Sequence, residues 1–194
     1  YFFLKMMRYT LLFWLPVYLM NSLGYSSTSA AGMAACFELS GAAGSILVVR
    51  SAQTWFNRNY FLTSGCYLAI LAFICILHPL LSHAGWVTTV ISVSLMGFII
   101  HGVDLLMSGV FALESVPPEL QSRAVGLVNA IGSLGQTLSA LVVLWMTLTI
   151  GWNGLFNLFV IFALAAAAVC IKEHLHPSQT VPDRTVLNVL NSST

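Results

Sequence analysis

Apolar residues fill six long windows of this chain, and short polar stretches separate them. The windows are residues 2–20, 29–49, 60–81, 86–112, 123–148 and 153–171. A helix needs about 20 apolar residues to cross the hydrocarbon of a bilayer. Backbone groups in hydrocarbon must also be hydrogen-bonded within their own segment, which favours helices. The pattern therefore predicts an all-α, polytopic membrane protein with six transmembrane helices.

The composition supports this fold class. Of the 194 residues, 58% are hydrophobic and 7% are charged, whereas a soluble domain carries roughly 25% charged residues. The formal net charge is +1, and the Lys and Arg residues are scattered rather than gathered into the basic stripe that nucleic acid requires. We expect a six-helix bundle over residues 1–172, embedded in the lipid bilayer, and a polar cytoplasmic tail over residues 173–194.

Catalytic and cofactor motifs do not occur in the sequence. It has no Walker sequence, no Gly-x-Gly-x-x-Gly, no metal-binding His spacing and no Ser-His-Asp order, so we expect no enzyme, no cofactor and no metal site. The four cysteines lack Cys-x-x-Cys spacing, and we interpret them as core thiols: Cys36, Cys66, Cys75 and Cys170.

The positions of Lys and Arg beside the windows predict the orientation. Cytoplasmic loops of membrane proteins are enriched in these residues. The cations in the second and fourth connections and the tail would all lie on one side of the membrane, and the other connections have none: Arg50, Arg58, Arg123, Lys172 and Arg184. We expect this side, and both ends of the chain, to be cytoplasmic. Because the chain starts at Tyr1 within an apolar window, we also expect it to be a piece of a longer protein.

Two cations lie inside the first window. Lys5 and Arg8 are three residues apart and would share one helix face. A charge in the middle of a membrane costs about 2.5–3.5 kcal/mol on insertion scales and usually has a function. One interpretation is that both side chains face a cavity and bind an anionic substrate, with the guanidinium of Arg8 donating two hydrogen bonds to a phosphate. The alternative is that they reach out to the lipid headgroups.

Three more ionisable residues lie within the windows. His101 and Asp104 are also three residues apart, on one face of the fourth window. They would form either the wall of a polar cavity or an internal polar pair that holds helices together. Glu38 in the second window is a candidate ion partner of Lys5 or Arg8, or else a helix-packing acceptor. His78, beside Pro79, is expected at a membrane interface.

Small residues at helical spacing allow helices to approach closely. We therefore expect packing faces in the second and fifth windows, at Gly32, Gly41, Gly44, Gly126, Gly132 and Gly135.

Several blocks in order resemble one transporter family. They are Arg8-Tyr9, Phe13-Trp14-Leu15-Pro16-Val17-Tyr18-Leu19, Glu38-x-x-Gly41-x-x-Gly44, Leu113-Glu114-Ser115-Val116-Pro117, Ala124-x-Gly126, Gly132-x-x-Gly135 and Gly151-Trp152-Asn153-Gly154-x-Phe156. Together they resemble helices 7–12 of the organophosphate:phosphate antiporters of the major facilitator superfamily. The chain departs from the family pattern at Ala52-Gln53, where a hinge carboxylate is lost, and at His101 and Asp104 in a helix that is less charged elsewhere in the family.

This resemblance implies a function. The fold would consist of two six-helix halves with substrate held between them near mid-membrane, and this chain would be the second half. Arg8 matches a phosphate-binding position, and some eukaryotic members carry lysine at the position of Lys5. The leading hypothesis is alternating-access exchange of a phosphorylated sugar or glycerol phosphate for inorganic phosphate, in the plasma membrane or the endoplasmic reticulum. The partners would be these phosphates and the missing N-terminal half.

Two other functions remain open. A transport-inactive sensor of sugar phosphate would keep the same fold. A proton-coupled transporter of another organic anion would use His101 and Asp104 as its proton site.

Overall fold

A computed structural model describes residues 1–176, and residues 177–194 lie outside the description. The described part is helical and contains six long helices. They are α1 (Phe2–Asn21), α2 (Ser27–Thr54), α3 (Tyr60–Ala84), α4 (Trp86–Leu105), α6 (Gln121–Thr149) and α7 (Trp152–Leu175). The six predicted windows therefore all form helices, and α2 continues five residues beyond the predicted end at residue 49. Most of the predicted tail lies outside the described residues, but its first residues continue α7.

Local sequence explains where several helices begin. The hydroxyl of Ser26 accepts a hydrogen bond from the backbone N–H of Ser29 at the start of α2. The side chain of Asn59 accepts one from the N–H of Leu62 at the start of α3. Such caps satisfy N–H groups that have no partner within the helix. The turns before α4 and α7 are short because Gly85 and Gly151 take positive φ angles of 140° and 83°, which side chains disfavour.

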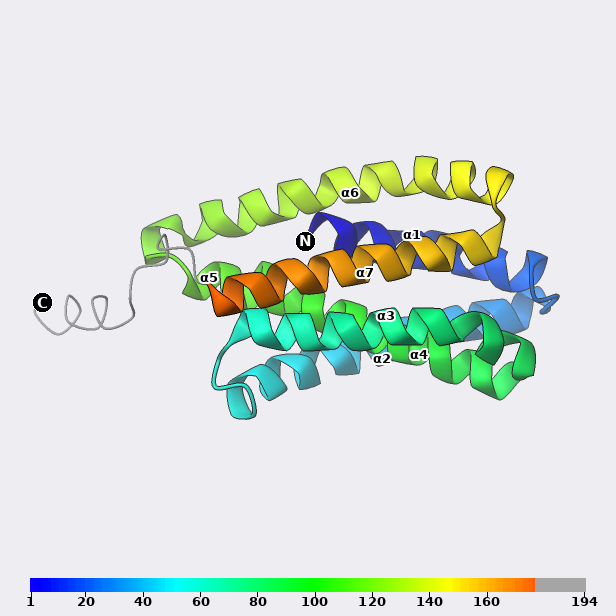
Figure 1. The fold of residues 1–194 in the computed structure, drawn as a ribbon, viewed down its shortest axis with the longest axis horizontal. Helices are drawn as coiled ribbons and strands as arrows, with labels where there is room; N and C mark the ends of the chain where they lie inside the picture. Colours follow the sequence, from blue (N-terminus) through cyan, green and yellow to red (C-terminus); the bar gives the residue numbers. More distant parts are fainter. Residues whose placement is uncertain (177–194) are drawn as a thin grey trace, which may run out of the picture.

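The helices form an elongated bundle (Figure 1). Five helical stretches in the described part are long and apolar enough to cross a membrane: Ser27–Thr54, Tyr60–Ala84, Trp86–Glu114, Pro118–Thr149 and Gly154–Leu175. α1, which carries Lys5 and Arg8, is not among them; it begins about midway along the bundle (Figure 1). Many large apolar side chains on the outer surface are exposed, among them Leu39, Leu80 and Leu148. This is the surface expected of a protein whose solvent is lipid.

The fourth window is interrupted by a change of helix type. A π-helix, η1 (Leu106–Phe111), follows α4 and leads into the short helix α5 (Ala112–Glu114), and a 3₁₀ turn (Pro118–Leu120) then precedes α6. A π-helix has an i→i+5 pattern and is frequent at functional sites. The sequence pattern did not predict it, because apolar periodicity over one window does not distinguish helix types.

Glycines bring α2 and α4 into close contact. A Cβ atom added at Gly41 would overlap the ring of His101, and one added at Gly44 would overlap the carbonyl group of Phe98. From the other side, a Cβ at Gly97 would meet the carbonyl of Phe37. The Ser40 hydroxyl also donates to the carbonyl of Ser94 across the same contact, at 2.7 Å. We call this contact between α2 and α4 the glycine seam.

The α1–α6 contact is built in the same way. A Cβ at Gly135 would overlap the carbonyl of Phe2, and one at Gly132 would meet Tyr1 and Lys5. Four of the six predicted packing glycines therefore lie where helices approach closely. Gly32 and Gly126 do not, because a Cβ at either would have open space around it.

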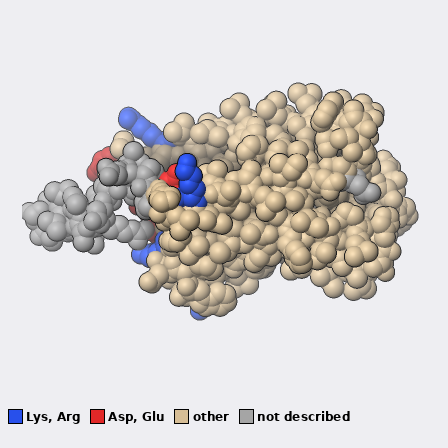
Figure 2. Space-filling model, in the orientation of Figure 1, with Lys and Arg blue, Asp and Glu red and all other residues tan. Residues whose placement is uncertain are grey.

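Charged side chains lie mainly near one end of the molecule (Figure 2). Among the described residues, the rest of the visible face shows no Lys, Arg, Asp or Glu (Figure 2). At this end Arg58, in the turn after α2, forms an ion pair with Glu114 at 3.3 Å, and the Tyr60 hydroxyl donates to the same carboxylate at 2.6 Å. That this end faces the cytoplasm stays a prediction.

Candidate anion-binding site

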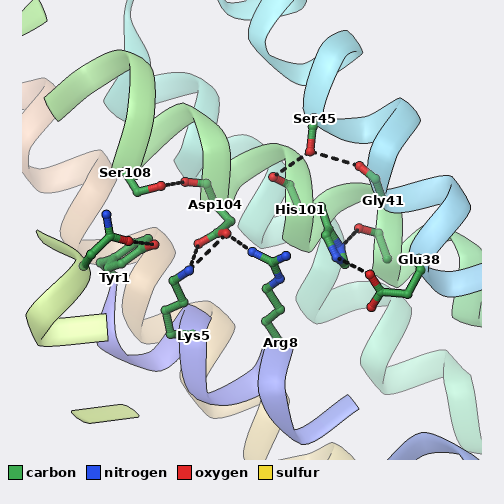
Figure 3. A network of polar contacts seen from close by, with 11 residues as sticks. Tyr1, Lys5, Arg8, Glu38, Gly41, Ser45, His101, Asp104 and Ser108 are labelled. Carbon is green, nitrogen blue, oxygen red and sulfur yellow. Dashed lines mark hydrogen bonds and ion pairs between the residues drawn. The ribbon is translucent and has the colours of Figure 1, made fainter. Parts of the chain in front are cut away.

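Lys5 and Arg8 point from their helix toward Asp104 (Figure 3). They lie on consecutive turns of α1 and meet Asp104 on α4. Lys5 Nζ lies 3.2 Å from Asp104 Oδ1, and Arg8 Nη1 donates to Asp104 Oδ2. The interpretation that these cations reach out to the lipid headgroups is therefore wrong. Glu38 is not the ion partner of either cation, because Asp104 takes that place.

Burial makes this cluster energetically significant. The side chain of Asp104 is 7% exposed, that of Lys5 12% and that of Arg8 25%. Charges removed from water require partners, because the attraction within a low-dielectric interior must offset their desolvation. Lys5 and Arg8 carry two formal positive charges, and Asp104 supplies one negative charge. The cluster therefore keeps a formal excess of one positive charge, which favours the binding of an anion.

The backbone of Asp104 is held at the start of the π-helix. The Ser108 hydroxyl, within η1, donates to the Asp104 carbonyl oxygen at 2.7 Å. The N–H of Leu106 is shared between the carbonyls of Gly102 and Val103. The π-helix thus begins two residues after the residue that pairs with both cations.

His101 lies beside this cluster but has a different partner. Its Nε2 atom is 3.3 Å from Oε2 of Glu38, whose side chain is 45% exposed (Figure 3). Its Nδ1 atom contacts the carbonyl of Gly97 at 2.9 Å. The carboxylate beside the imidazole is therefore Glu38 on α2, and not Asp104 on the same helix face.

The structure brings all five predicted site residues into one region. α1 contributes Lys5 and Arg8, α2 contributes Glu38, and α4 contributes His101 and Asp104 (Figure 3). Sequence reasoning missed their aromatic neighbours. Lys5 Nζ lies 5.3 Å from the centre of the Tyr1 ring and 5.7 Å from that of Tyr9, within the range of cation–π attraction.

Two residues of α6 complete the surroundings. The Tyr1 hydroxyl donates to Asn129 Oδ1 at 3.4 Å, and Gly132 leaves the space that the Lys5 side chain fills. Asn129 lies three residues before Gly132, so the helical spacing of a polar residue and a small one could have marked this face.

A second buried polar cluster lies away from these cations. His78 is fully buried; its Nε2 contacts the Tyr18 hydroxyl at 3.1 Å and its Nδ1 contacts the Ser92 hydroxyl at 2.9 Å. His78 therefore lies inside the bundle, among other helices, and its depth in the membrane stays a prediction. Its ring also packs against Phe156, with ring centroids 4.3 Å apart. The interaction fastens α1, α3, α4 and α7 together, and its physical basis is the satisfaction of buried polar atoms.

The remaining chemistry of the described residues is limited. No set of three or more His, Cys, Asp or Glu side chains in residues 1–176 could hold a metal ion. All four cysteines have free thiols, and Cys75 and Cys170 are buried. What the arrangement can do is bind an anion through a lysine and an arginine inside an apolar bundle.

Comparison with known proteins places this bundle in a family. The family model described as Major Facilitator Superfamily matches residues 1–189. The chain belongs to the Major Facilitator Superfamily. This membership confirms the predicted fold class, although the chain spans well under half the length of the curated relatives it matches.

Among members of the superfamily, the curated relatives include phosphate-ester transporters. The chain is 25% identical to the glycerol-3-phosphate transporter of Haemophilus influenzae over 91% of this chain and 41% of that protein. It is 25% identical to the glucose-6-phosphate exchanger SLC37A2 of Mus musculus, over 81% of this chain and 32% of that protein. It is 24% identical to the sugar phosphate exchanger 3 of Mus musculus, over 81% and 33% respectively.

The resemblance noted from the sequence is therefore confirmed: this superfamily member is similar to glycerol-3-phosphate transporters and sugar-phosphate exchangers. No solved structure matches the chain.

Proposed function

We propose that this chain is the C-terminal six-helix half of an antiporter that exchanges a phosphorylated sugar or glycerol phosphate for inorganic phosphate. The observation that carries the proposal is the pair of inward-pointing cations, Lys5 and Arg8, with a single buried carboxylate between them. Its support also comes from relatives named as glycerol-3-phosphate transporters and glucose-6-phosphate exchangers.

In the proposed mechanism, Arg8 binds the substrate phosphate. A guanidinium can donate two parallel hydrogen bonds to two phosphate oxygens, and these charge-assisted bonds are stronger than neutral ones. Lys5 adds a second positive charge one turn away on the same face of α1. Phosphate groups carry their charge on several oxygens, so both cations can engage one phosphate.

The other half of the antiporter would close the site. Substrate would lie near mid-membrane between the two halves, as in transporters built from related repeats. Binding of phosphate would offset the desolvation of the cations and allow the halves to close around it. Without phosphate the charged site would resist closure, so net movement would require an anion on each side.

Exchange from phosphate-loaded liposomes tests this function. The intact protein that contains this chain would be reconstituted and given labelled glucose 6-phosphate or glycerol 3-phosphate. We expect uptake that requires internal phosphate and that is lost in Arg8→Ala. Normal exchange by Arg8→Ala would contradict the proposal, and binding without uptake would indicate a sensor.

The matched control is Arg123→Ala. Arg123 is an exposed residue near the start of α6 and is not among the residues that contact Asp104. Its removal takes away the same charge and side chain without altering the cation cluster, so we expect uptake by this variant to match the unmodified protein.

One contact favours a second candidate function. The imidazole of His101 lies against the half-exposed carboxylate of Glu38, an arrangement that can hold and release a proton. A proton-coupled carrier of an organic anion would take up substrate when the outside is acidified, with no phosphate inside. In that case Glu38→Gln would remove the effect of the proton gradient.

A further inference from the structure

The anion-binding cations already have an anionic partner within the chain. Both Asp104 oxygens lie within reach of Lys5 Nζ, at 3.2 Å and 3.3 Å, and Oδ2 also accepts from Arg8 Nη1. The carboxylate comes from α4 and the cations from α1, so the pairing crosses between two helices (Figure 3).

The Asp104 carboxylate satisfies only part of the hydrogen-bonding capacity and charge of the two cations. Its contact with Arg8 runs through one guanidinium nitrogen, and the buried Nε of Arg8 makes no hydrogen bond within residues 1–176. A carboxylate also brings one negative charge to two positive ones. A phosphate has more oxygens and can carry more charge, so it matches the pair better than Asp104 does.

We propose that Asp104 is a built-in counter-ion that occupies Lys5 and Arg8 when the site is empty, and that a phosphate substrate binds by displacing it. This inference rests on the proposed function, because it concerns the same anion site. The Ser108 hydroxyl holds the backbone carbonyl of Asp104 and not its side chain. The cations, and not Ser108, therefore hold the carboxylate where it is.

Displacement gives the site a defined balance between binding and release. An incoming phosphate must break the contacts of Asp104 with both cations, which weakens its binding. The same carboxylate returns to the cations as phosphate leaves, which speeds release. Removal of the carboxylate should therefore lower both the Kd and the KM for phosphate and slow the maximal exchange rate.

The test uses the intact protein and inorganic phosphate as the probe. The Kd for phosphate is measured by calorimetry in detergent, and phosphate:phosphate exchange is measured in liposomes. For Asp104→Asn we expect a Kd about tenfold lower, as expected for the loss of a competing charged hydrogen bond. The KM for phosphate should fall together with the maximal exchange rate. Asp104→Asn is nearly isosteric, so the change tests charge rather than shape.

Glu119→Gln is the matched control. Glu119 is exposed in the 3₁₀ turn before α6, far along the chain from α1. This variant loses the same charge outside the cluster, and we expect its Kd and exchange rate to equal those of the unmodified protein. A purely structural role for Asp104 would lower the amount of folded protein without lowering the Kd or KM.

The outcomes separate this inference from the proposed function. If the unmodified protein neither binds nor exchanges phosphate, the proposed function fails, and this inference fails with it. If it does both while folded Asp104→Asn binds phosphate no more tightly, only the counter-ion inference is overturned.

A second variant keeps the inference testable if Asp104→Asn folds poorly. Asp104→Ala leaves space for an external anion, so added formate or phosphate should raise its thermal unfolding midpoint more than that of the unmodified protein. The unmodified protein already holds a carboxylate there. An equal response of the two proteins to both anions would overturn the inference.

Discussion

The Glu38 carboxylate lies 3.3 Å from His101 Nε2, while Asp104, on the next turn of α4, pairs with α1. α4 therefore contributes a residue to each ion contact of the site, His101 toward α2 and Asp104 toward α1. Because the two carboxylates have separate partners, substitutions of each should have separable effects.

Replacing Arg8 with lysine should distinguish charge from geometry. Lysine keeps the positive charge but cannot donate two parallel hydrogen bonds to a phosphate. We expect Arg8→Lys to retain phosphate-dependent uptake with a KM for phosphate about tenfold higher, in keeping with the loss of one charge-assisted bond. Initial uptake rates over a range of phosphate concentrations measure this. A KM equal to that of the unmodified protein would show that Arg8 acts as a point charge.

The glycine seam should tolerate no side chain at Gly44. An added methyl group would overlap the carbonyl of Phe98, so α2 and α4 would have to separate. We expect Gly44→Ala to lower the free energy of unfolding by about 1–3 kcal/mol, the usual cost of overpacking. Thermal unfolding in detergent measures the change.

Gly32→Ala on the same helix is the control for that substitution. A Cβ at Gly32 has open space around it, and alanine favours a helix over glycine by about 1 kcal/mol. We expect this variant to be as stable as the unmodified protein or more stable. Equal destabilisation by both variants would show that the seam is not the cause.

The His78 cluster should depend on the Tyr18 hydroxyl. The Ser92 hydroxyl donates to the carbonyl of Thr89, so it accepts from Nδ1 of His78, and Nε2 must then accept from Tyr18. Tyr18→Phe would leave the buried Nε2 without its donor, at a cost of about 1–3 kcal/mol in stability. Thermal unfolding of the single variant should show this loss.

A double substitution checks the cause of that loss. When His78 is replaced by leucine, the Tyr18 hydroxyl has lost its partner, so adding Tyr18→Phe should cost less than it does in the unmodified protein. Equal costs in both backgrounds would mean that the hydroxyl stabilises the bundle in another way.

The two ends of the bundle should react with reagents from opposite sides of the membrane. Ser22 follows α1 at one end, and Glu119 lies in the turn before α6 at the other. In a cysteine-free protein in sealed cells, we expect an impermeant thiol reagent added outside to label Ser22→Cys and to spare Glu119→Cys. For a protein of an internal membrane, the outside corresponds to the lumen. The reverse pattern would contradict the orientation predicted from Lys and Arg.

The helices were predictable from the sequence because apolar windows of about 20 residues leave few alternatives in a membrane. Lys5, Arg8 and Asp104 could also be singled out from the sequence, because charged residues within such windows are rare. Their pairing was not predictable, because Glu38 and Asp104 offered equivalent carboxylates. Only the relative rotation of α1, α2 and α4 decides which carboxylate meets the cations.

Other features depend on geometry that single residues do not reveal. The π-helix after Asp104 arises from hydrogen-bond spacing, which apolar periodicity does not record. The burial of His78 within the bundle was not predictable, because its position within the third window does not show which helices surround it. Ser92 and Tyr18, which bury the imidazole, come from other helices.

The glycine seam also has a mechanical consequence. Because α2 and α4 meet backbone against backbone at Gly44 and Gly97, we expect the two helices to move together. If phosphate displaces Asp104, any resulting movement of α4 would be shared by α2, which leads to the turn that holds Arg58. Glu114, the ion partner of Arg58, ends the helical stretch that begins with α4. Movement at the anion site in the middle of the bundle would thus reach its charged end through these helices and would not require the movement of a loop between them.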